Sequence, residues 1–212
     1  KVIGPTFSIN TKLLDFGTVS YGFMYSKSIE IENKSEIPFD YTLSLSQDGT
    51  FSKREFSIKP NTATIGKYTR QSVLIEFIPV SLQNYDLELD FDIAKYGQKL
   101  ASIPVKAKCI CPEIQIEKTK FDLGNIFIGY SYKALIDLFD NTDYPAKYEF
   151  IPVTDSTQLQ AKTDVPKPNG TIFQHDKASL ELLITPIQLG PILLNQSVRI
   201  YGNDKQPINF TI

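Results

Sequence analysis

The sequence predicts an all-β protein built of two tandem β-sandwiches, and two observations lead to this prediction. Apolar and polar residues alternate over short runs, turn residues recur about every 8 to 12 positions, and no window keeps a helical period of about 3.6 residues over three turns. Residues 14–41 also recur without a gap as residues 121–148, a shift of 107 positions. A repeat of this length is a whole small domain and is too long for a solenoid unit.

The two copies share seven identical residues within that window. These are Asp15/Asp122, Gly17/Gly124, Gly22/Gly129, Tyr25/Tyr132, Ile29/Ile136, Pro38/Pro145 and Tyr41/Tyr148. The residues between them keep their physical character, as in Val19/Ile126. We expect the domains to span residues 1–111 and 112–212. The last apolar residues match at an offset of 105, which predicts a hairpin two residues shorter in the second copy.

The first copy begins with a predicted strand over residues 6–9. In the next segment Leu14 and Val19 point inward, and Gly17 permits a bend between them. Residues 26–33 alternate cleanly between apolar and polar, as a strand with one buried face does. The same alternation, interrupted by turn residues, predicts strands at 39–45, 56–58, 62–65, 71–78, 85–93 and 100–107.

The second copy repeats this plan. Its expected strands are residues 114–116, 135–139, 146–151, 170–173, 179–184, 193–201 and 208–212. Residues 159–168 replace the phenylalanine-containing strand of the first copy. Many short antiparallel strands predict a sandwich of the immunoglobulin type. The chain has no tryptophan and no cysteine within either predicted core, so the antibody-type core is excluded.

Composition excludes several classes of protein. The net charge of −2 recruits neither nucleic acid nor an acidic membrane surface, and no run of 18 apolar residues exists. The chain does not begin with methionine, from which we expect a piece of a longer protein. The only cysteines, Cys109 and Cys111, would lie about 6.5 to 7 Å apart on a strand, which disfavours a disulfide. Two thiols indicate a reducing, cytoplasmic location.

No residue pattern predicts catalysis, a metal site or a cofactor. His175 is the only histidine, lies in a polar turn and has no nucleophile elbow or glycine-rich loop to work with. A structural zinc site needs four ligands, and the Cys-x-Cys pair has no second pair. The acidic row from Asp86 to Asp92 alternates with apolar residues, which predicts the solvent face of a strand.

Two sets of residues are candidate protein contacts. Tyr21 and Phe23, with Tyr130 in the second copy, precede a strand at what we expect to be a loop tip, where aromatic residues serve as anchors. Gly22, Gly129, Tyr25 and Tyr132 occur in both copies and are therefore interpreted as structural. The second set is basic and would suit an acidic tubulin tail, although scattered surface charge is the favoured interpretation: Lys53, Arg54, Lys67 and Arg70.

The repeated stretch has a recognisable form. Leu-Asp-Phe-Gly at 14–17 and Phe-Asp-Leu-Gly at 121–124 are each followed by a second glycine, a strand, a polar turn and a proline. Phe-Ser-Ile-Lys-Pro at 56–60 and Glu-Phe-Ile-Pro at 76–79 come later, with Leu-Ile-Thr-Pro at 183–186 in the second copy. The chain resembles the ASH domains of the hydin type, which are relatives of the major sperm protein fold.

This resemblance implies a non-enzymatic scaffold segment of a long axonemal protein, in the central apparatus of motile cilia. Its implied partners are axonemal proteins and tubulin, with no nucleic acid and no membrane, and the chain alone would be monomeric. The alternative is a peptide-binding trafficking or centrosomal adaptor. A third reading, an extracellular adhesion tandem, would require glycans on the four Asn-x-Ser/Thr sites, which begin at Asn33, Asn169, Asn195 and Asn209.

Overall fold

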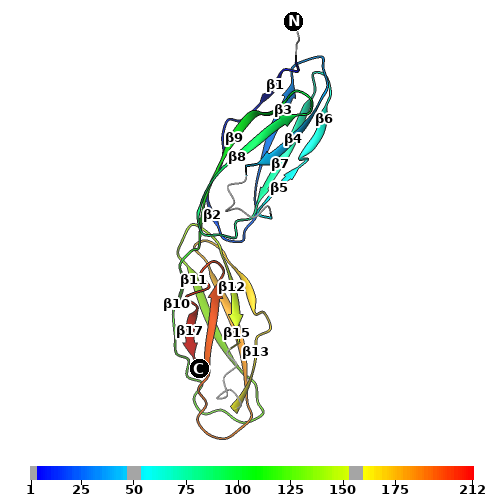
Figure 1. Cartoon of the computed structure of the whole chain (residues 1–212). Coiled ribbons are helices and arrows are strands. Elements are labelled where there is room, and N and C mark those ends of the chain that lie inside the picture. Colours follow the sequence, from blue (N-terminus) through cyan, green and yellow to red (C-terminus); the bar gives the residue numbers. More distant parts are fainter. Residues whose placement is uncertain (1–3, 47–53, 153–159) are drawn as a thin grey trace. The chain divides into compact units, whose positions relative to one another are not determined.

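The computed structural model describes residues 4–46, 54–152 and 160–212. Its strands form two compact units, Lys1–Ile110 and Cys111–Ile212, and the predicted boundary lies one residue later. Figure 1 shows the first unit in blue to green and the second in green to red. The described residues hold seventeen strands and no α-helix. The predicted all-β, immunoglobulin-like fold class is confirmed.

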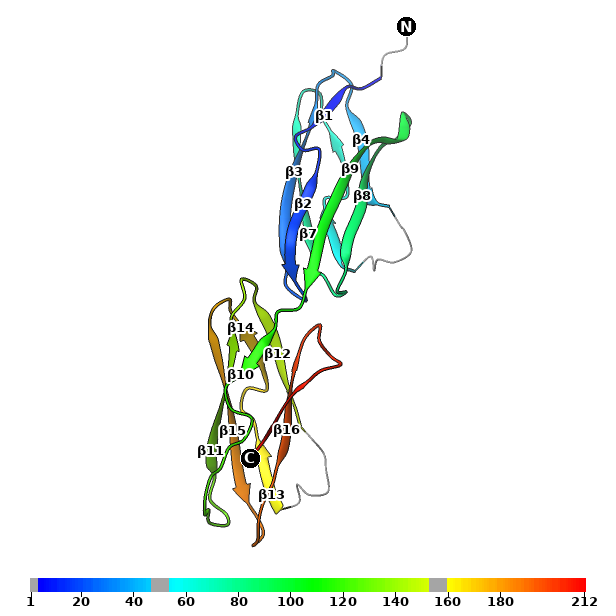
Figure 2. The same cartoon turned by 90° about the vertical axis from the view of Figure 1, so that its left-hand side faces the viewer.

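Two sheets make up the first unit. One has the strand order β1 (Phe7–Ile9), β3 (Tyr25–Asn33), β7 (Arg70–Phe77) and β5 (Phe56–Lys59). The other has the order β2 (Leu14–Ser20), β9 (Gly97–Ile110), β8 (Asn84–Ile93), β4 (Phe39–Leu45) and β6 (Thr62–Ile65). All neighbours are antiparallel except β2 and β9, which run in parallel side by side, as Figure 2 shows. The chain therefore changes sheet between β1 and β2.

The second unit also has two sheets. The first has the order β10 (Ile114–Ile116), β11 (Tyr132–Asp140), β15 (Lys177–Pro186) and β13 (Ala161–Asp164). The second has the order β14 (Asn169–Ile172), β12 (Ala146–Ile151), β16 (Asn195–Ile200) and β17 (Ile208–Thr211). The order matches the first unit, except that residues 121–128 form no strand where β2 would stand.

Strand β13 was missed by sequence analysis. Only Ala161 of its four residues is buried, so the segment carries almost no apolar alternation. It becomes a strand because its backbone pairs with the edge of β15, from Ala161 opposite Pro186 to Asp164 opposite Leu183. A strand of this kind is defined by its neighbour, which a local sequence pattern does not reveal.

The predicted shortening of the last hairpin is wrong. In the first unit Leu89 pairs with Ile103, and in the second Gln196 pairs with Phe210. Each member of the second pair lies 107 positions after its counterpart, so the offset of the repeat holds to the last strand. The match at 105 arose because alternating strands resemble themselves after a shift of two residues, since the side-chain period is two.

The Asp-x-Gly motif fixes the same local bend in both copies and builds a bulge in the first. The carboxylate of Asp15 accepts the backbone N–H of Gly17 at 2.8 Å, and Asp122 accepts that of Gly124 at the same distance. Both glycines have positive φ, 69° and 64°, a conformation that side-chain-bearing residues rarely adopt. In β2 the pairing register with β9 shifts at this point. The bulge thus turns the strand while Leu14 and Val19 both stay buried, as predicted.

The two cores differ in their side chains. The first contains stacked aromatic rings, with Phe56 and Phe77 4.2 Å apart and Tyr85 edge-on to Phe77 at 4.9 Å. The second core is mainly aliphatic, with Ile136, Leu182 and Val198 among its fully buried side chains. The backbone plan therefore tolerates two different packings, as cores do when volume and pattern are kept.

The acidic row on β8 is only partly a solvent face. Asp86 and Glu88 are exposed as predicted, but Asp90 is buried, with 6% of its surface accessible. Its carboxylate accepts a hydrogen bond from Ser102 at 2.9 Å and pairs with the Lys99 ammonium at 3.0 Å. The hairpin at the start of β9 brings Lys99 over the row, so the neighbouring strand buries a charge that local alternation assigned to solvent.

A buried amide ties the turn after β3 to the opposite sheet. Asn33 is 1% exposed, and its Nδ2 donates to the carbonyls of Ile37 at 2.9 Å and Gly66 at 3.0 Å, while its Oδ1 accepts the N–H of Ser35. Asp140 is the counterpart of Asn33 in the second unit. Its carboxylate accepts the N–H of Thr142 at 2.8 Å, as Asn33 accepts that of Ser35, but it has no N–H groups to donate. A glycan on Asn33 would require these bonds to break, which argues against the adhesion reading.

We expect Asn33→Ala to destabilise the first unit by about 1–3 kcal/mol, because it leaves buried carbonyls without a donor. Urea unfolding of the full chain measures the loss. Asn84→Ala, at an exposed position on β8, is the matched control and should change stability by less than about 0.5 kcal/mol. Equal effects of the two variants would contradict the assignment.

Candidate protein-interaction surfaces

The turn after β2 has the same geometry in both units. Gly22 has a φ of 75° and its N–H donates to Pro79 at 2.7 Å, and Gly129 has a φ of 81° and donates to Pro186 at 2.9 Å. The hydroxyl of Tyr25 accepts the N–H of Ser20 at 2.8 Å. These glycines and tyrosines hold the turn, so their structural interpretation is confirmed.

The aromatic residues between these anchors lie in different environments. Tyr21 and Phe23 are half-buried, and Tyr21 packs against the core of the first unit. Tyr130, the counterpart of Phe23, is 69% exposed. Of the three aromatic contact candidates, Tyr130 is therefore the one that the described structure presents to solvent.

Tyr130 belongs to an exposed apolar region of the second unit. Its ring stands edge-on to that of Phe127, with centroids 6.4 Å apart. The loop that follows β15 adds Ile187, Leu189 and Leu193, all more than half exposed. We call this set, Phe127, Ile128, Tyr130, Ile187, Leu189 and Leu193, the apolar end. Exposed apolar clusters of this kind are typical of interaction sites.

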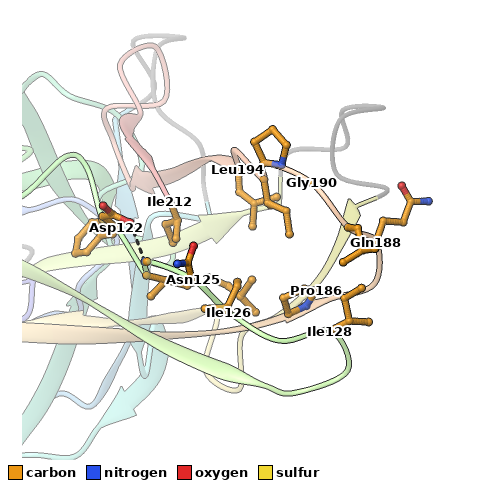
Figure 3. A pocket seen from close by; sticks show the side chains of 16 residues that line it. Asp122, Asn125, Ile126, Ile128, Pro186, Gln188, Gly190, Leu194 and Ile212 are labelled. Carbon is orange, nitrogen blue, oxygen red and sulfur yellow. Dashed lines mark hydrogen bonds between the residues drawn. The ribbon is translucent and has the colours of Figure 1, made fainter.

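A groove of about 440 Å³ lies between the two segments that form the apolar end. One wall is residues 121–128 and the other is residues 186–194, with Ile184 among the buried residues beneath. Figure 3 shows Ile126 and Ile128 on one side and Leu194 across from them. No titratable side chain other than Asp122 is among the lining residues, so the groove suits apolar side chains or backbone rather than a charged small molecule.

The structure does not gather the predicted basic residues. Lys67 and Arg70 are exposed near one end of β7. Arg54 lies near the other end, because it precedes Phe56, which pairs with Phe77. The two ends of a strand of eight residues are roughly 25 Å apart. Lys53 lies outside the described residues. An acidic peptide therefore meets no single basic groove formed by the described members of this set.

Arg70 is moreover engaged within its own sheet. Its guanidinium lies 3.2 Å from the Glu30 carboxylate and 3.1 Å from that of Glu32. Desolvation raises the pKa of the Glu32 carboxyl group. The hydrogen bond and the positive charge of Arg70 outweigh this effect and hold the pKa of Glu32 below its usual value. A partner carboxylate would have to displace these two glutamates.

The described residues contain no cluster of side chains that fits a metal ion. Residues 4–46, 54–152 and 160–212 hold no group of three or more His, Cys, Asp and Glu side chains that could bind a metal ion. The thiols of Cys109 and Cys111 form no disulfide, and burial raises the pKa of Cys111. His175 is exposed, with Nε2 2.8 Å from a carboxylate oxygen of Asp143. Within the same ranges no helix has the length and apolarity to span a bilayer.

Comparison with known proteins agrees with this architecture. A family model described as HYDIN/CFA65/VesB-like, Ig-like domain matches residues 5–108. The chain is 26% identical to the Hydrocephalus-inducing protein of Mus musculus and 25% identical to its homolog in Homo sapiens, in each case over 98% of this chain. It spans about 4% of the length of each of these relatives.

Among solved structures, the chain is similar to an ASH / PapD-like domain of human CEP192, with 17% sequence identity and a TM-score of 0.41. The alignment covers 52% of this chain and 94% of the CEP192 domain. The fold and the family match define the protein as a tandem of immunoglobulin-like domains. More specifically, the first unit matches the model of the HYDIN/CFA65/VesB-like, Ig-like domain, and the whole chain is similar to the hydrocephalus-inducing proteins.

We expect Tyr25→Phe to destabilise the first unit by about 1 kcal/mol, because the N–H of Ser20, a fully buried residue, loses its acceptor. Tyr132→Phe should cost less, because its partner is the N–H of Phe127, a residue 74% exposed, and water can replace the hydroxyl. Urea unfolding with hydrogen exchange resolved by unit measures both. Tyr68→Phe, at an exposed tyrosine, is the control, and equal losses in the two units would contradict this account.

Proposed function

We propose that the chain is a non-enzymatic scaffold segment of a long axonemal protein in the central apparatus of motile cilia, where it is required for normal beating. The observation that supports this most is the match of both units to hydrocephalus-inducing proteins of which they make up about 4%. A chain that spans so little of its relatives while repeating one sandwich plan twice supports the role of a repeated building block. Such blocks set length and spacing.

The proposed mechanism is passive. Each sandwich is held by an apolar core and by hydrogen-bonded turns, so it resists deformation, while exposed side chains and free sheet edges contact neighbours. Axonemal proteins are the proposed partners, with tubulin as a further candidate, and neither nucleic acid nor membrane is involved. The apolar end of the second unit is the proposed contact surface, with Tyr130 as its anchor. The chain in isolation is proposed to be monomeric.

The absence of a catalytic role is proposed on the same grounds. Asp122 is the only titratable side chain that lines the groove, and the groups of the described residues with shifted pKa values lie elsewhere. Burial and the neighbouring Glu55 carboxylate raise the pKa of Tyr85, which donates to Glu55 at 3.1 Å inside the first core. A catalytic acid or base would need to face a cleft.

No specific observation favours the adaptor alternative. A peptide-binding adaptor of the related class would need several cations around one groove, and the described basic residues are separated along β7 or paired with glutamates.

Tagging the full-length protein in a ciliated cell tests the location. We expect signal along the axoneme that survives detergent removal of the membrane, and loss of the protein should leave axonemes assembled but beating abnormally. Signal at internal membranes, or signal removed by detergent, would contradict the scaffold and favour the adaptor.

Tyr130→Ser tests the contact surface. We expect the variant chain to bind detergent-extracted axonemes about 5- to 30-fold more weakly, because truncating an aromatic anchor costs about 1–2 kcal/mol. Co-pelleting over a concentration series measures the affinity. Tyr68→Ser, which removes a tyrosine of similar exposure from the first unit, is the matched control. Equal binding of both variants would exclude the apolar end as the contact.

A further inference from the structure

The carboxylate of Asp140 has one buried oxygen without a donor. Asp140 is 1% exposed, and its Oδ1 accepts the N–H of Thr142 at 2.8 Å and the hydroxyl of Thr142 at 2.7 Å. Its Oδ2 is buried and has no hydrogen-bond partner within the described residues. A carboxylate oxygen in this state is strongly unfavourable, because burial removes its water and no protein group replaces it.

The first unit shows what this oxygen faces. At the equivalent position, the amide nitrogen of Asn33 donates to three backbone carbonyls, those of Ile37 at 2.9 Å, Gly66 at 3.0 Å and Ile65 at 3.4 Å. The counterparts of these residues, 107 positions later, are Tyr144, Phe173 and Ile172. In the second unit an acceptor therefore stands where the first unit has a donor.

The turn that holds Asp140 repeats the turn of Asn33 bond for bond. The N–H groups of Asp140 and Asn33 both donate to the opposite turn at 2.9 Å. The carbonyl of Tyr144 accepts a hydroxyl at 3.1 Å, as its counterpart does at 3.3 Å. The carbonyl of Phe173 accepts a backbone N–H at 3.2 Å, as its counterpart does at 3.3 Å, and Ile172 pairs with β12 as its counterpart pairs with β4. Because the backbone is the same, the Oδ2 of Asp140 lies against the same three carbonyl oxygens.

The charge of the two turns differs in the same sense. Residues 33–36 and 67–70 of the first unit contain three basic side chains and one acidic side chain. Their counterparts in the second unit contain three aspartates, one histidine and one lysine, Lys177. The ammonium group of Lys177 is already paired with Asp137 at 3.3 Å. This turn of the second unit therefore attracts cations, whereas that of the first repels them.

We propose that the second unit binds a monovalent cation between the Oδ2 of Asp140 and the carbonyl oxygens of Tyr144, Phe173 and Ile172. Carboxylate and carbonyl oxygens are the ligands that hard cations prefer. A cation contacts all of these oxygens at once, whereas a proton on Oδ2 would serve only one carbonyl. A single carboxylate balances one positive charge, and a divalent ion would leave a buried charge without a partner.

The size of the site favours sodium over potassium. In the first unit, the amide nitrogen lies within 3.0 Å of two of the carbonyl oxygens, which leaves little room, and sodium is the smaller ion. The bound ion holds the turn after β11 to the end of β14, as the amide of Asn33 does for the equivalent segments of the first unit. The inference concerns how the second unit is held together and does not depend on the axonemal role.

Exchange of the salt tests the site in the full chain. Thermal unfolding and hydrogen exchange are measured in sodium, potassium and choline chloride at the same ionic strength of about 0.15 M. Relative to choline, sodium should raise the unfolding midpoint of the second unit by about 3 °C and slow exchange of peptides covering residues 140–146 and 172–176 by about fivefold, with a smaller effect of potassium. Peptides covering residues 33–39 are the internal reference and should exchange equally in all three salts.

Two variants that remove the same charge separate the site from general screening. Asp140→Asn supplies the amide that the first unit uses, so the second unit should stay folded, and its exchange should be slow and equal in all three salts. Asp143→Asn removes a charge from the same turn at a side chain that is 83% exposed, and it should keep the sodium effect.

Equal exchange of the unaltered chain in the three salts, or a sodium effect that survives Asp140→Asn, would overturn the proposal. Protection that appears only on acidification, with no difference between salts, would assign the oxygen to a proton and exclude the ion. A stronger effect of calcium chloride at equal ionic strength would contradict the monovalent assignment.

Discussion

The parallel pairing of β2 with β9 is the constraint around which the first sandwich is arranged. It requires the N-terminal segment to leave the sheet that holds β1 and join the opposite sheet, and it requires a bend in β2 that keeps both of its ends buried. The Asp15 carboxylate and the positive φ of Gly17 provide that bend. The last strand then runs beside β2 for its full length and covers Val19, so one pairing closes an edge of the sandwich.

The repeat separates residues that build the fold from residues that are free to differ. Gly17, Gly22, Tyr25 and their counterparts hold the same local backbone geometry in both copies, and each has a geometric reason for its identity. The aromatic positions between them vary: Phe23 is half-buried, and its counterpart Tyr130 is exposed. At positions of the second kind the two copies present different surfaces.

Electrostatics in this protein mainly hold strands together. Arg70 is paired with glutamates across the β3 and β7 pair, and Lys99 covers the buried Asp90 on β8. Charges used in this way are satisfied before a partner arrives, and they contribute little to long-range attraction. The residues of the apolar end, by contrast, carry no charge, and within the described residues the rings of Phe127 and Tyr130 contact each other edge-on.

By itself the sequence determined the fold class, the repeat of 107 positions, most strands, the bend at Gly17 and the structural role of the turn glycines and tyrosines, because these depend on alternation and local backbone geometry. Only the tertiary structure decided features that arise from neighbours. Strand β13 exists because β15 offers an edge, Asp90 is buried because Lys99 folds over it, and the alignment at 105 failed because a period-two pattern matches itself after a shift of two. The groove and the separation of Arg54 from Arg70 likewise depend on which strands pack together, and pairing between residues distant in sequence leaves no local signal.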